Sequence, residues 1–461
     1  MSVFATSRWK NLLCVSLLLI GLTFFSACDF TADNPGATPD DQLNQEVAVP
    51  SIVAGMERAF AEAMNYIAYE GGAVSLEINA AGSIAQFGIS TAERQGDLLP
   101  TEGSPTWDLG HTARFTAEDG AERMREILGE EFSSSERALK ALLWVGYSNR
   151  MLGENYCYAI IDGGEAQSRS VHFDRAEQAF TEAIDIAQNI GNTQLENAAR
   201  AGRAQINVNQ GDWDEALSDA ELVPRDFEYH VPYFSDTRTQ YNRIYWANAN
   251  DPYRAHTVAD TYVGPDATED DPGGDIEFSP VDGSDYYVES GDSRVPYDTD
   301  PEFDIGDTGE IAWFPQLKHD SRTAPIILAS GTEMELIRAE YELVENSDRS
   351  AAMGIINDVR AQVPRDDTEE VDSGTGVSAR SASNLEEAWG WLKRERQIEL
   401  WLEGRRMGDR RRWIESDAVP NEHPEQDLPG RDLCWPPNQT EIESNPNIDR
   451  GVDDLGAPYD Y

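Results

Sequence analysis

The chain has 461 residues, of which 40% are hydrophobic and 9% aromatic, so it holds enough apolar side chains for one large core or two moderate ones. This composition excludes a wholly disordered chain. The 36 Lys and Arg stand against 85 Asp and Glu, which gives a formal net charge of -49. A nucleic-acid partner is therefore excluded, because phosphate binding needs a basic surface.

The choice of cations is also uneven, since only four are lysines and the other 32 are arginines. We interpret this acidic, lysine-poor composition as halophilic adaptation. In molar salt the Debye length shrinks to about 3 Å, and dense surface carboxylates then stop repelling one another. An ordinary acidic extracellular protein would carry a similar charge, and the sequence leaves that alternative open.

The first 27 residues are typical of an export signal. Arg8 and Lys10 precede an apolar run of about 14 residues from Leu12 to Phe25, which is shorter than the roughly 20 residues that span a bilayer. No later stretch is long enough either. We expect residues 1–27 to be a lipoprotein signal peptide and residues 28–48 to form a flexible tether.

Cys28 follows the small residues Ser26 and Ala27, as in a bacterial lipobox. We expect its thiol to carry a diacylglyceryl group, so that palmitate-like chains anchor the protein at about 0.8 kcal/mol per buried methylene. Phe25 departs from the usual Leu of a lipobox, and a plain signal peptide is the alternative. We predict that Cys28→Ala moves the protein out of the detergent phase in a phase-partitioning assay. A variant that stays there would contradict the anchor.

Two other cysteines, Cys157 and Cys434, belong to the expected mature chain. They either pair in an oxidising compartment or remain buried free thiols, and we prefer the second interpretation.

Helical periodicity predicts tetratricopeptide-like helix pairs over residues of about 133–224. We expect a capping box of Ser133 with Glu136, a helix that begins at Asp174, and another from Gln194 to about Asn209. A four-residue pattern recurs forty residues apart, as Phe173-Asp174-Arg175-Ala176 and Trp213-Asp214-Glu215-Ala216.

Residues of about 225–314 are predicted to be an acidic loop insertion, because Gly, Pro and Asp dominate them. Residues 260–310 carry 17 acidic side chains and Arg294 as their single cation. The run from Asp298 to Asp304 suggests calcium, but the Gly and terminal Glu of an EF-hand loop are missing, so we favour a solvated loop.

The C-terminal region, residues 332–461, returns to helical periodicity. We predict helices over 332–344, 348–363 and 384–413, the last of them the longest in the chain and capped by Asn384 with Glu387. An extended, Pro-rich strap should follow Pro420. The sequence thus predicts an all-α chain with a single domain over residues 49–461.

Three sets of motifs lie in this region. The first is Lys393-Arg394-Glu395-Arg396-Gln397-Ile398-Glu399-Leu400-Trp401-Leu402-Glu403-Gly404-Arg405-Arg406, with Asp409 and Arg411-Arg412-Trp413. The second is Glu335-Leu336-Ile337-Arg338-Ala339-Glu340, with Ile356-Asn357-Asp358-Val359-Arg360. The third is Pro436-Pro437, Glu441-Ile442 and Asn445-Pro446-Asn447-Ile448. In this order, behind a lipobox and tetratricopeptide-like helices, they resemble the SusD/RagB family of outer-membrane nutrient-binding lipoproteins.

The resemblance implies a SusD-like helical superhelix with tetratricopeptide-like helix pairs and long irregular loops. It also implies a non-catalytic receptor, anchored in the cell outer membrane and facing the exterior, that binds oligosaccharides and delivers them to a TonB-dependent, SusC-like transporter. A peptide-binding uptake receptor and a protein-docking scaffold without a small ligand are the alternatives. The identity of the glycan or peptide and the stoichiometry with the transporter stay open.

A glycan site combines aromatic faces with carboxylate, amide or guanidinium groups. We predict ligand contacts in the segment before the helical repeats and in or beside the acidic insertion, and we prefer the adjacent pair of tyrosines at 286 and 287. A place in the hydrophobic core is the alternative for each aromatic. The predicted ligand residues are Arg94, Asp97, Trp107, Trp246, Tyr286, Tyr287 and Trp313.

The arginines near the C-terminal motif are predicted to be architectural, because opposite charges recur three and four residues apart. An anion site is the rival interpretation, and it would be built from Arg405, Arg406, Arg410, Arg411 and Arg412. The six histidines show no metal spacing, and we find no nucleophile elbow, phosphate loop or dinucleotide fingerprint. No catalytic residue, metal or cofactor is predicted, although glycosidase-type carboxylate pairs cannot be seen in a sequence.

Overall fold

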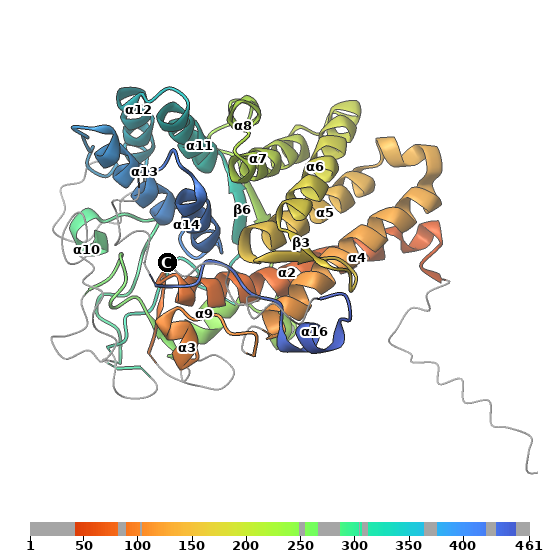
Figure 1. Ribbon diagram of the computed structural model, residues 1–461, viewed down its shortest axis with the longest axis horizontal. Helices are drawn as coiled ribbons and strands as arrows, with labels where there is room; N and C mark the ends of the chain where they lie inside the picture. Colours follow the sequence, from red (N-terminus) through yellow and green to blue (C-terminus); the bar gives the residue numbers. More distant parts are fainter. Residues whose placement is uncertain are drawn as a thin grey trace, which may run out of the picture. The chain divides into compact units, whose positions relative to one another are not determined.

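The computed structural model describes residues 42–81, 89–101, 104–248, 254–265, 286–303, 305–306, 312–363, 376–420 and 430–448. The predicted signal peptide, with Cys28, lies outside these residues. Residues Asn44–Tyr461 form one compact unit, which is the unit considered below. Helices dominate its described part and each described strand has at most five residues, so the predicted all-α fold is confirmed (Figure 1).

The described elements fall into longer helices and short connecting pieces. The longer helices are α2 (Val49–Val74), α4 (Ser104–Leu128), α5 (Glu136–Asn155), α6 (Ser170–Ile190), α7 (Thr193–Gln210), α8 (Trp213–Ala220), α11 (Gly331–Val344), α12 (Arg349–Arg360), α13 (Leu385–Glu399) and α14 (Arg406–Glu415). The short elements are η2 (Glu46–Ala48), β1 (Asn79–Ala80), α3 (Thr91–Gln95), η3 (Gly129–Ser134), β2 (Tyr158–Ile160), β3 (Ala166–Ser168), β4 (Glu228–Val231), η4 (Arg238–Gln240), α9 (Arg243–Asn248), β5 (His256–Thr257), α10 (Tyr286–Ser290), β6 (Ile326–Ser330) and α16 (Gln439–Ser444). The strands pair antiparallel, β1 with β5, β2 with β3 and β4 with β6.

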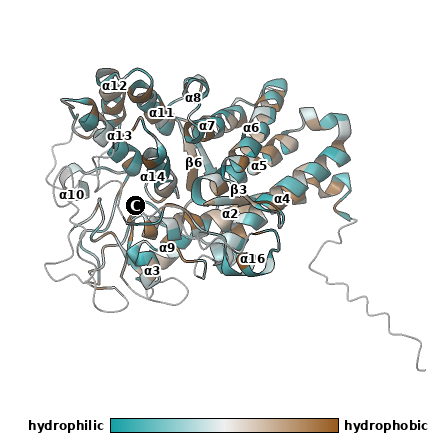
Figure 2. Cartoon of the chain, viewed as in Figure 1, coloured by the Kyte–Doolittle hydropathy of each residue, from teal (hydrophilic) through white to brown (hydrophobic). Residues whose placement is uncertain are grey.

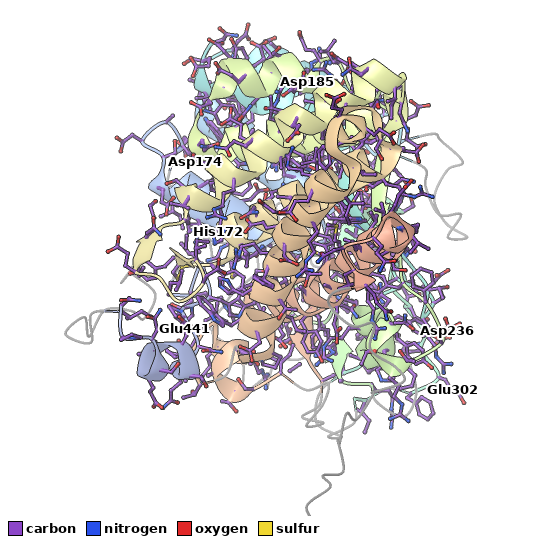
Figure 3. The ribbon with its side chains drawn as sticks, turned by 90° about the vertical axis from the view of Figure 1, so that its right-hand side faces the viewer. His172, Asp174, Asp185, Asp236, Glu302 and Glu441 are labelled. Carbon is purple, nitrogen blue, oxygen red and sulfur yellow. A yellow bond between two sulfur atoms is a disulfide. The ribbon has the colours of Figure 1, made fainter. Side chains whose placement is uncertain are left out.

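Apolar side chains at helical spacing build the main core around α2. Met56, Phe60, Ala63 and Ile67 recur at intervals of three and four residues, and all four are fully buried. Hydrophobic residues accordingly lie on the inward faces of the helices (Figure 2). Many carboxylates lie on the outside, as those of Asp185, Asp236 and Glu302 do (Figure 3). Among the described residues no helix combines the length and apolarity that a membrane crossing requires.

The predicted helix pairs are present as α5, α6 and α7, which pack side by side (Figure 1). The ring of Phe180 on α6 lies between two glycines, and a Cβ added to Gly146 or Gly202 would come within 2.5 Å or 2.4 Å of it. Small residues at the crossings therefore let the three helices approach around one aromatic ring. The predicted helix from Gln194 to Asn209 is confirmed within one residue at each end.

Two predicted helix starts are wrong. The cap of α5 is Ser135, whose hydroxyl accepts from the Ala138 N–H at 3.4 Å, whereas Ser133 lies in η3 and donates to the Glu130 carbonyl. The following helix begins at Ser170 rather than at Asp174. Several consecutive serines can each cap a helix, and only the one with an extended backbone does so here.

The predicted C-terminal helices are confirmed up to residue 399. Asp348 and Asn384 cap α12 and α13, and the Asn384 side chain accepts from the Glu387 N–H at 2.8 Å. Trp389 and Leu392 of α13 pack in a second buried cluster with side chains of α11 and α12. This cluster lies beside the tetratricopeptide-like helices, with β6 between them (Figure 1).

The predicted continuous helix over residues 384–413 is wrong, because the chain turns between α13 and α14. Leu402 and Gly404 have φ values of +58° and +67°, which no helix allows. The turn wraps around the end of α2, where the Trp401 indole donates to the Glu77 carbonyl at 2.9 Å and the Leu402 N–H donates to the Glu77 carboxylate at 3.0 Å. This partner lies more than 300 residues away in sequence, so the local pattern does not reveal the turn.

Arginines of the C-terminal motif lie inside the protein and bind carboxylates there, as predicted. Asp409 accepts from Arg396 at 2.9 Å and 3.1 Å and from Arg412 at 2.8 Å, and Arg412 also forms a bidentate pair with Glu340. These four side chains are all less than 8% exposed. The nearby opposite charges hold the pKa of the Asp409 carboxyl below its usual range.

Other arginines of the rival anion site are also engaged. Arg405 pairs with Glu154 and Glu333 at 3.2 Å and 2.9 Å, while Arg411 donates to three backbone carbonyls of residues 153–156. Arg406 donates to the Ser75 carbonyl. Because these guanidinium groups join separate helices in the interior, the architectural interpretation holds.

Glu77, at the end of α2, links stability to pH. Burial raises the pKa of Glu77 to about 7, although the Arg406 charge opposes this shift. The folded state therefore binds more protons than the unfolded chain between pH 4.5, which is the ordinary pKa of a glutamate, and about pH 7. The free energy of unfolding falls as pH rises through that window. We expect Glu77→Gln to be nearly neutral near the lower limit and to stabilise the protein by up to about 3 kcal/mol above the upper one. Urea unfolding at the two pH values measures this difference, and an equal effect at both would contradict it.

A disulfide joins Cys157 to Cys434, so the preferred interpretation of two free thiols is wrong. Their Cα atoms lie 5.1 Å apart because the strap runs beside β2. The Cys157 N–H donates to the Trp435 carbonyl at 3.0 Å, and the Trp435 N–H donates to the Asn155 carbonyl at 2.8 Å. The strap is thus fixed to the start of the β2–β3 hairpin by one covalent bond and two hydrogen bonds.

Candidate functional site

A cavity of about 420 Å³ lies between α4, the turn after β2 and α16, and we call it the α4 cavity. Its volume falls in the range of small-ligand pockets, which is about 300–1,000 Å³. The residues that line it are Trp107, Asp108, His111, Thr112, Arg114, Phe115, Ile160, Asp162, Gly163 and Glu441.

The strap closes one wall of the α4 cavity through side-chain amides. Asn438 caps α16 and donates to Asp108 of α4 at 2.9 Å. Asn445 and Asn447 donate to the carbonyls of Gly164 and Gly163 at 2.9 Å and 2.7 Å. The last described residues of the chain thereby bring Glu441 to the cavity mouth (Figure 3).

Aromatic side chains of α4 form the floor and rim of the α4 cavity. Trp107, His111 and Phe115 recur every four residues, which places them on one side of the helix. Trp107 is 4% exposed and lies 4.3 Å from the His111 ring and 5.4 Å from Tyr156, measured between centroids. Phe115 is 54% exposed. A ring of this kind at a cavity rim offers an apolar face to a ligand.

Two histidines behind the cavity are held neutral. Burial, together with the Arg114 charge, lowers the pKa of His111 to about 3, and burial lowers the pKa of His172 well below its ordinary value. The Nδ1 atom of His172 faces the Asn149 side-chain oxygen at 2.9 Å, and the Asn149 amide nitrogen donates to Glu118. Nδ1 of His172 therefore carries the proton and Nε2 is an acceptor, as the hydrogen-bond network assigns them.

The Nε2 atoms of both histidines are buried and have no hydrogen-bond partner among the described residues. The two rings lie 6.3 Å apart between centroids (His172 is labelled in Figure 3). Buried polar atoms without a partner are uncommon in folded proteins and indicate an unfilled hydrogen bond. The His111 ring lines the α4 cavity, so a ligand hydroxyl there can complete its hydrogen bonding.

The charges at the α4 cavity favour an uncharged ligand. The buried Arg114 donates to Glu118 at 2.6 Å and to Asp162 at 2.5 Å, so its charge is compensated. Asp108 and Glu441 add two more carboxylates at the mouth. Anionic ligands are repelled there, and the described residues contain no group of three His, Cys, Asp or Glu that could hold a metal ion.

Of the predicted ligand residues, Trp107 lines the α4 cavity and the others are placed elsewhere. Arg94 and Asp97 flank the end of α3, where the Arg431 guanidinium donates to the Arg94 carbonyl at 2.7 Å. Trp246 is 9% exposed and packs against Tyr241, with ring centroids 5.1 Å apart.

The aromatics predicted in the acidic insertion are buried. The Tyr286 hydroxyl donates to Asp292 at 2.6 Å, the Tyr287 ring lies 5.0 Å from Tyr297, and Trp313 is 6% exposed. The structure therefore gives these rings the core positions that were the alternative for each aromatic. Their contact with a ligand stays a prediction.

Sequence reasoning missed most of the α4 cavity. The aromatic spacing of positions 107, 111 and 115 is visible in the sequence and could have placed Phe115 beside Trp107. No local pattern in the sequence predicts that Glu441 lines this cavity. Its position depends on the contact between the strap and Asp108, which lies 330 residues before Asn438 in the sequence.

Comparisons with known proteins agree on one family. Residues 331–452 match the sequence model of the SusD family. A SusD superfamily structure from Bacteroides vulgatus is 13% identical, with a TM-score of 0.60 over 88% of this chain and 98% of that one. A SusD-like protein from Bacteroides fragilis is 12% identical, with a TM-score of 0.60 over 89% and 98%.

A third similar structure is described as a SusD-like carbohydrate binding protein from Bacteroides vulgatus, 15% identical, with a TM-score of 0.52 over 78% of this chain and 83% of that one. No curated protein matches the chain. The solved structures share the fold across most of this chain, and the family match covers the motifs that fix the C-terminal helices and strap. Residues 331–452 thus match the SusD family, and the chain shares the fold of SusD superfamily structures.

Proposed function

We propose that this protein is a non-catalytic receptor that binds neutral oligosaccharides in the α4 cavity. The observation that carries the proposal is the exposed ring of Phe115 beside the neutral imidazole of His111, in a cavity with an acidic mouth. Sugar rings stack their C–H faces on aromatic rings, while their hydroxyls need hydrogen-bond partners. The SusD-like carbohydrate binding protein of the same fold supports this ligand class.

Each side chain has a role in this proposal. Phe115 supports one face of a sugar ring, and the unpartnered Nε2 of His111 binds a hydroxyl. Carboxylates of Asp108 and Glu441 accept from further hydroxyls. The same carboxylates reject uronic or sulfated sugars, so the ligand is neutral.

We further propose that the protein is anchored to the outer membrane through Cys28 and passes its ligand to a TonB-dependent transporter. The lipobox-like sequence before Cys28 supports the anchor, and the family supports the transporter as partner. The match of residues 331–452 to the SusD family supports a role at the cell surface.

The test is calorimetry on residues 29–461 in high salt, with neutral and anionic oligosaccharides as ligands. We expect binding of neutral glycans alone, and a weakening of about tenfold for Phe115→Ala, which corresponds to about 1.4 kcal/mol of lost stacking. The matched control is Phe234→Ala, which removes another ring that is 47% exposed but lies outside the cavity. An equal loss in both variants would contradict the cavity assignment.

The other functions give different results in the same experiment. Peptide binding in place of glycan binding would support the peptide-uptake receptor, and silence toward both classes would support the docking scaffold. Each mixture is analysed afterwards for cleavage. A shortened glycan in a pure sample would show an enzyme and defeat the proposal.

A further inference from the structure

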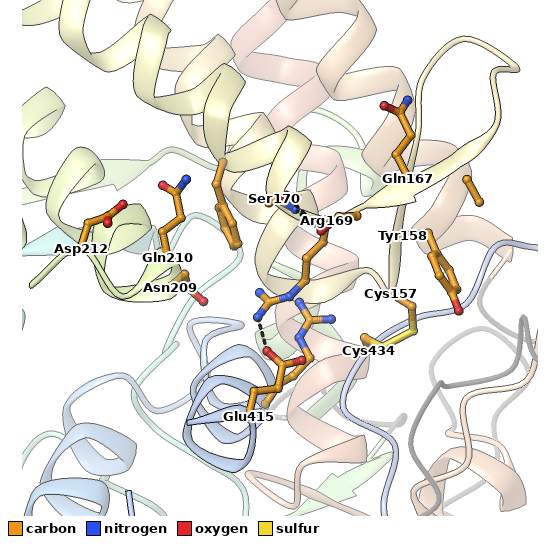
Figure 4. A pocket seen from close by; sticks show the side chains of 14 residues that line it. Cys157, Tyr158, Gln167, Arg169, Ser170, Asn209, Gln210, Asp212, Glu415 and Cys434 are labelled. Carbon is orange, nitrogen blue, oxygen red and sulfur yellow. Dashed lines mark hydrogen bonds and ion pairs between the residues drawn. A yellow bond between two sulfur atoms is a disulfide. The ribbon is translucent and has the colours of Figure 1, made fainter. Parts of the chain in front are cut away.

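A second cavity, of about 720 Å³, is lined partly by the β2–β3 hairpin, and we call it the hairpin groove (Figure 4). Residues from β2, β3, the start of α6, the end of α7 and α14 line it. A smaller cavity of about 280 Å³ continues it along α8 and α14, because Asn209, Gln210 and Glu415 line both. Together they form a track rather than a single pocket.

Two amide oxygens in this groove lack donors. The Asn209 amide nitrogen donates to the Gln205 carbonyl at 3.0 Å, and that of Gln210 donates to Asp174 at 3.2 Å. The oxygens of both side chains are buried and have no hydrogen-bond partner among the described residues. Leaving a buried acceptor unpaired costs about 1–3 kcal/mol, so each of these two oxygens favours a ligand that supplies a donor.

Among the other polar groups of the hairpin groove, the arginines are compensated, and Asp212 adds one exposed carboxylate. Arg169 pairs with Glu415 at 2.6 Å across the groove (Figure 4), and the Arg411 guanidinium is bound to backbone carbonyls. The hydroxyls of Ser168 and Ser170 lie 3.0 Å apart on the hairpin side. A neutral ligand with many hydroxyls fits these groups. An extended peptide would instead need apolar pockets for alternate side chains.

The hairpin groove and the α4 cavity share strand β2 as a wall. Tyr158 lines the groove and Ile160 lines the α4 cavity. Residues two apart on a strand point to the same face and lie roughly 7 Å from each other. Next to them, Cys157 lines the groove while the adjoining Tyr156 packs against Trp107 of the α4 cavity.

We propose that the hairpin groove is a second glycan subsite, which binds further sugar residues of the chain held in the α4 cavity. The inference rests on the proposed function and extends it, because it makes the protein selective for long neutral oligosaccharides. Two linked sites raise affinity without any new kind of contact, since the second binding step is intramolecular.

The test compares a disaccharide with an octasaccharide of the same neutral series, in calorimetry on residues 29–461. We expect the octasaccharide to bind at least about tenfold more tightly. The double substitution Asn209→Leu with Gln210→Leu removes both acceptor oxygens at similar volume and should abolish this advantage, while disaccharide affinity stays unchanged. Asn189→Leu, on an exposed amide of α6, is the matched control and should retain the advantage.

A second variant, Tyr158→Ala, changes the opposite wall of the groove and guards against a folding defect in α7. The subsite proposal is overturned if the disaccharide and the octasaccharide bind with equal affinity. It is also overturned if both groove variants still bind the octasaccharide more tightly than the disaccharide. Neither result contradicts the proposed function. Groove variants that weaken a neutral extended peptide but no glycan would also overturn it. The proposed function itself is contradicted if the disaccharide does not bind, or if Phe115→Ala leaves its affinity unchanged.

Discussion

Reduction of the disulfide between Cys157 and Cys434 is expected to lower the free energy of unfolding by about 4–5 kcal/mol. The bond joins residues 277 positions apart, so it removes much conformational freedom from the unfolded chain. The native contacts of the strap remain after reduction, because the side chains and backbone groups around Trp435 keep their hydrogen bonds. Urea unfolding with and without dithiothreitol measures the effect.

The control for this prediction is the double variant Cys157→Ser with Cys434→Ser, whose stability should not respond to dithiothreitol and should equal that of the reduced protein. The prediction fails if thiol titration shows two free cysteines and the unfolding curve has not moved. Binding of neutral glycans should persist in the reduced protein while it stays folded, since the strap keeps its hydrogen bonds and still supplies Glu441 to the α4 cavity.

Replacement of Asp409 by asparagine should lower the free energy of unfolding by about 3–5 kcal/mol. The Asp409 carboxylate lies between the guanidinium groups of Arg396 and Arg412, and all three side chains are buried. An asparagine of nearly the same shape keeps the packing but leaves the two buried cations one carboxylate short. Their remaining partners are Glu340 and, at 3.5 Å from Arg396, Glu333.

A matched control is Asp119→Asn, which breaks an exposed pair with Arg123 on α4. Its carboxylate is 41% exposed, so its removal should change stability by less than about 1 kcal/mol. Urea is the denaturant to use, because guanidinium chloride would itself screen the charges. If both variants lose a similar free energy of unfolding, burial does not increase the contribution of the Asp409 ion pairs to stability.

Local signals in the sequence were sufficient for much of the fold. The helices at 332–344 and 348–363 follow from apolar spacing and a capping aspartate, because helix formation depends on neighbours within a few residues. The architectural role of the arginines was predicted from charges three and four residues apart, and Arg412 with Asp409 is such a pair. The partners of Arg405 lie on distant segments and were not predicted. The break at Leu402 was not predicted either, since it arises from the contact of that turn with Glu77 at the far end of the chain.

The candidate site was harder to predict from the sequence than the fold. Trp107 was identified by its residue type, but it is buried in the core as Tyr286 and Tyr287 are. The exposed ring of the cavity, Phe115, was missed. Residue type cannot distinguish an aromatic at a cavity rim from one in the interior, because exposure depends on what the rest of the chain places beside it. The disulfide and the position of Glu441 depend in the same way on the path of the strap.

The hydrogen bond from Asn438 to Asp108 also sets an order in time. The two residues are 330 positions apart, and a ribosome that adds about 5–20 residues per second makes the second of them on the order of tens of seconds after the first. During that interval α4 exists without the wall that completes its cavity. The α4 cavity is thus completed at the end of synthesis, and a chain truncated before the strap would keep its helical repeats but lack this wall of the cavity.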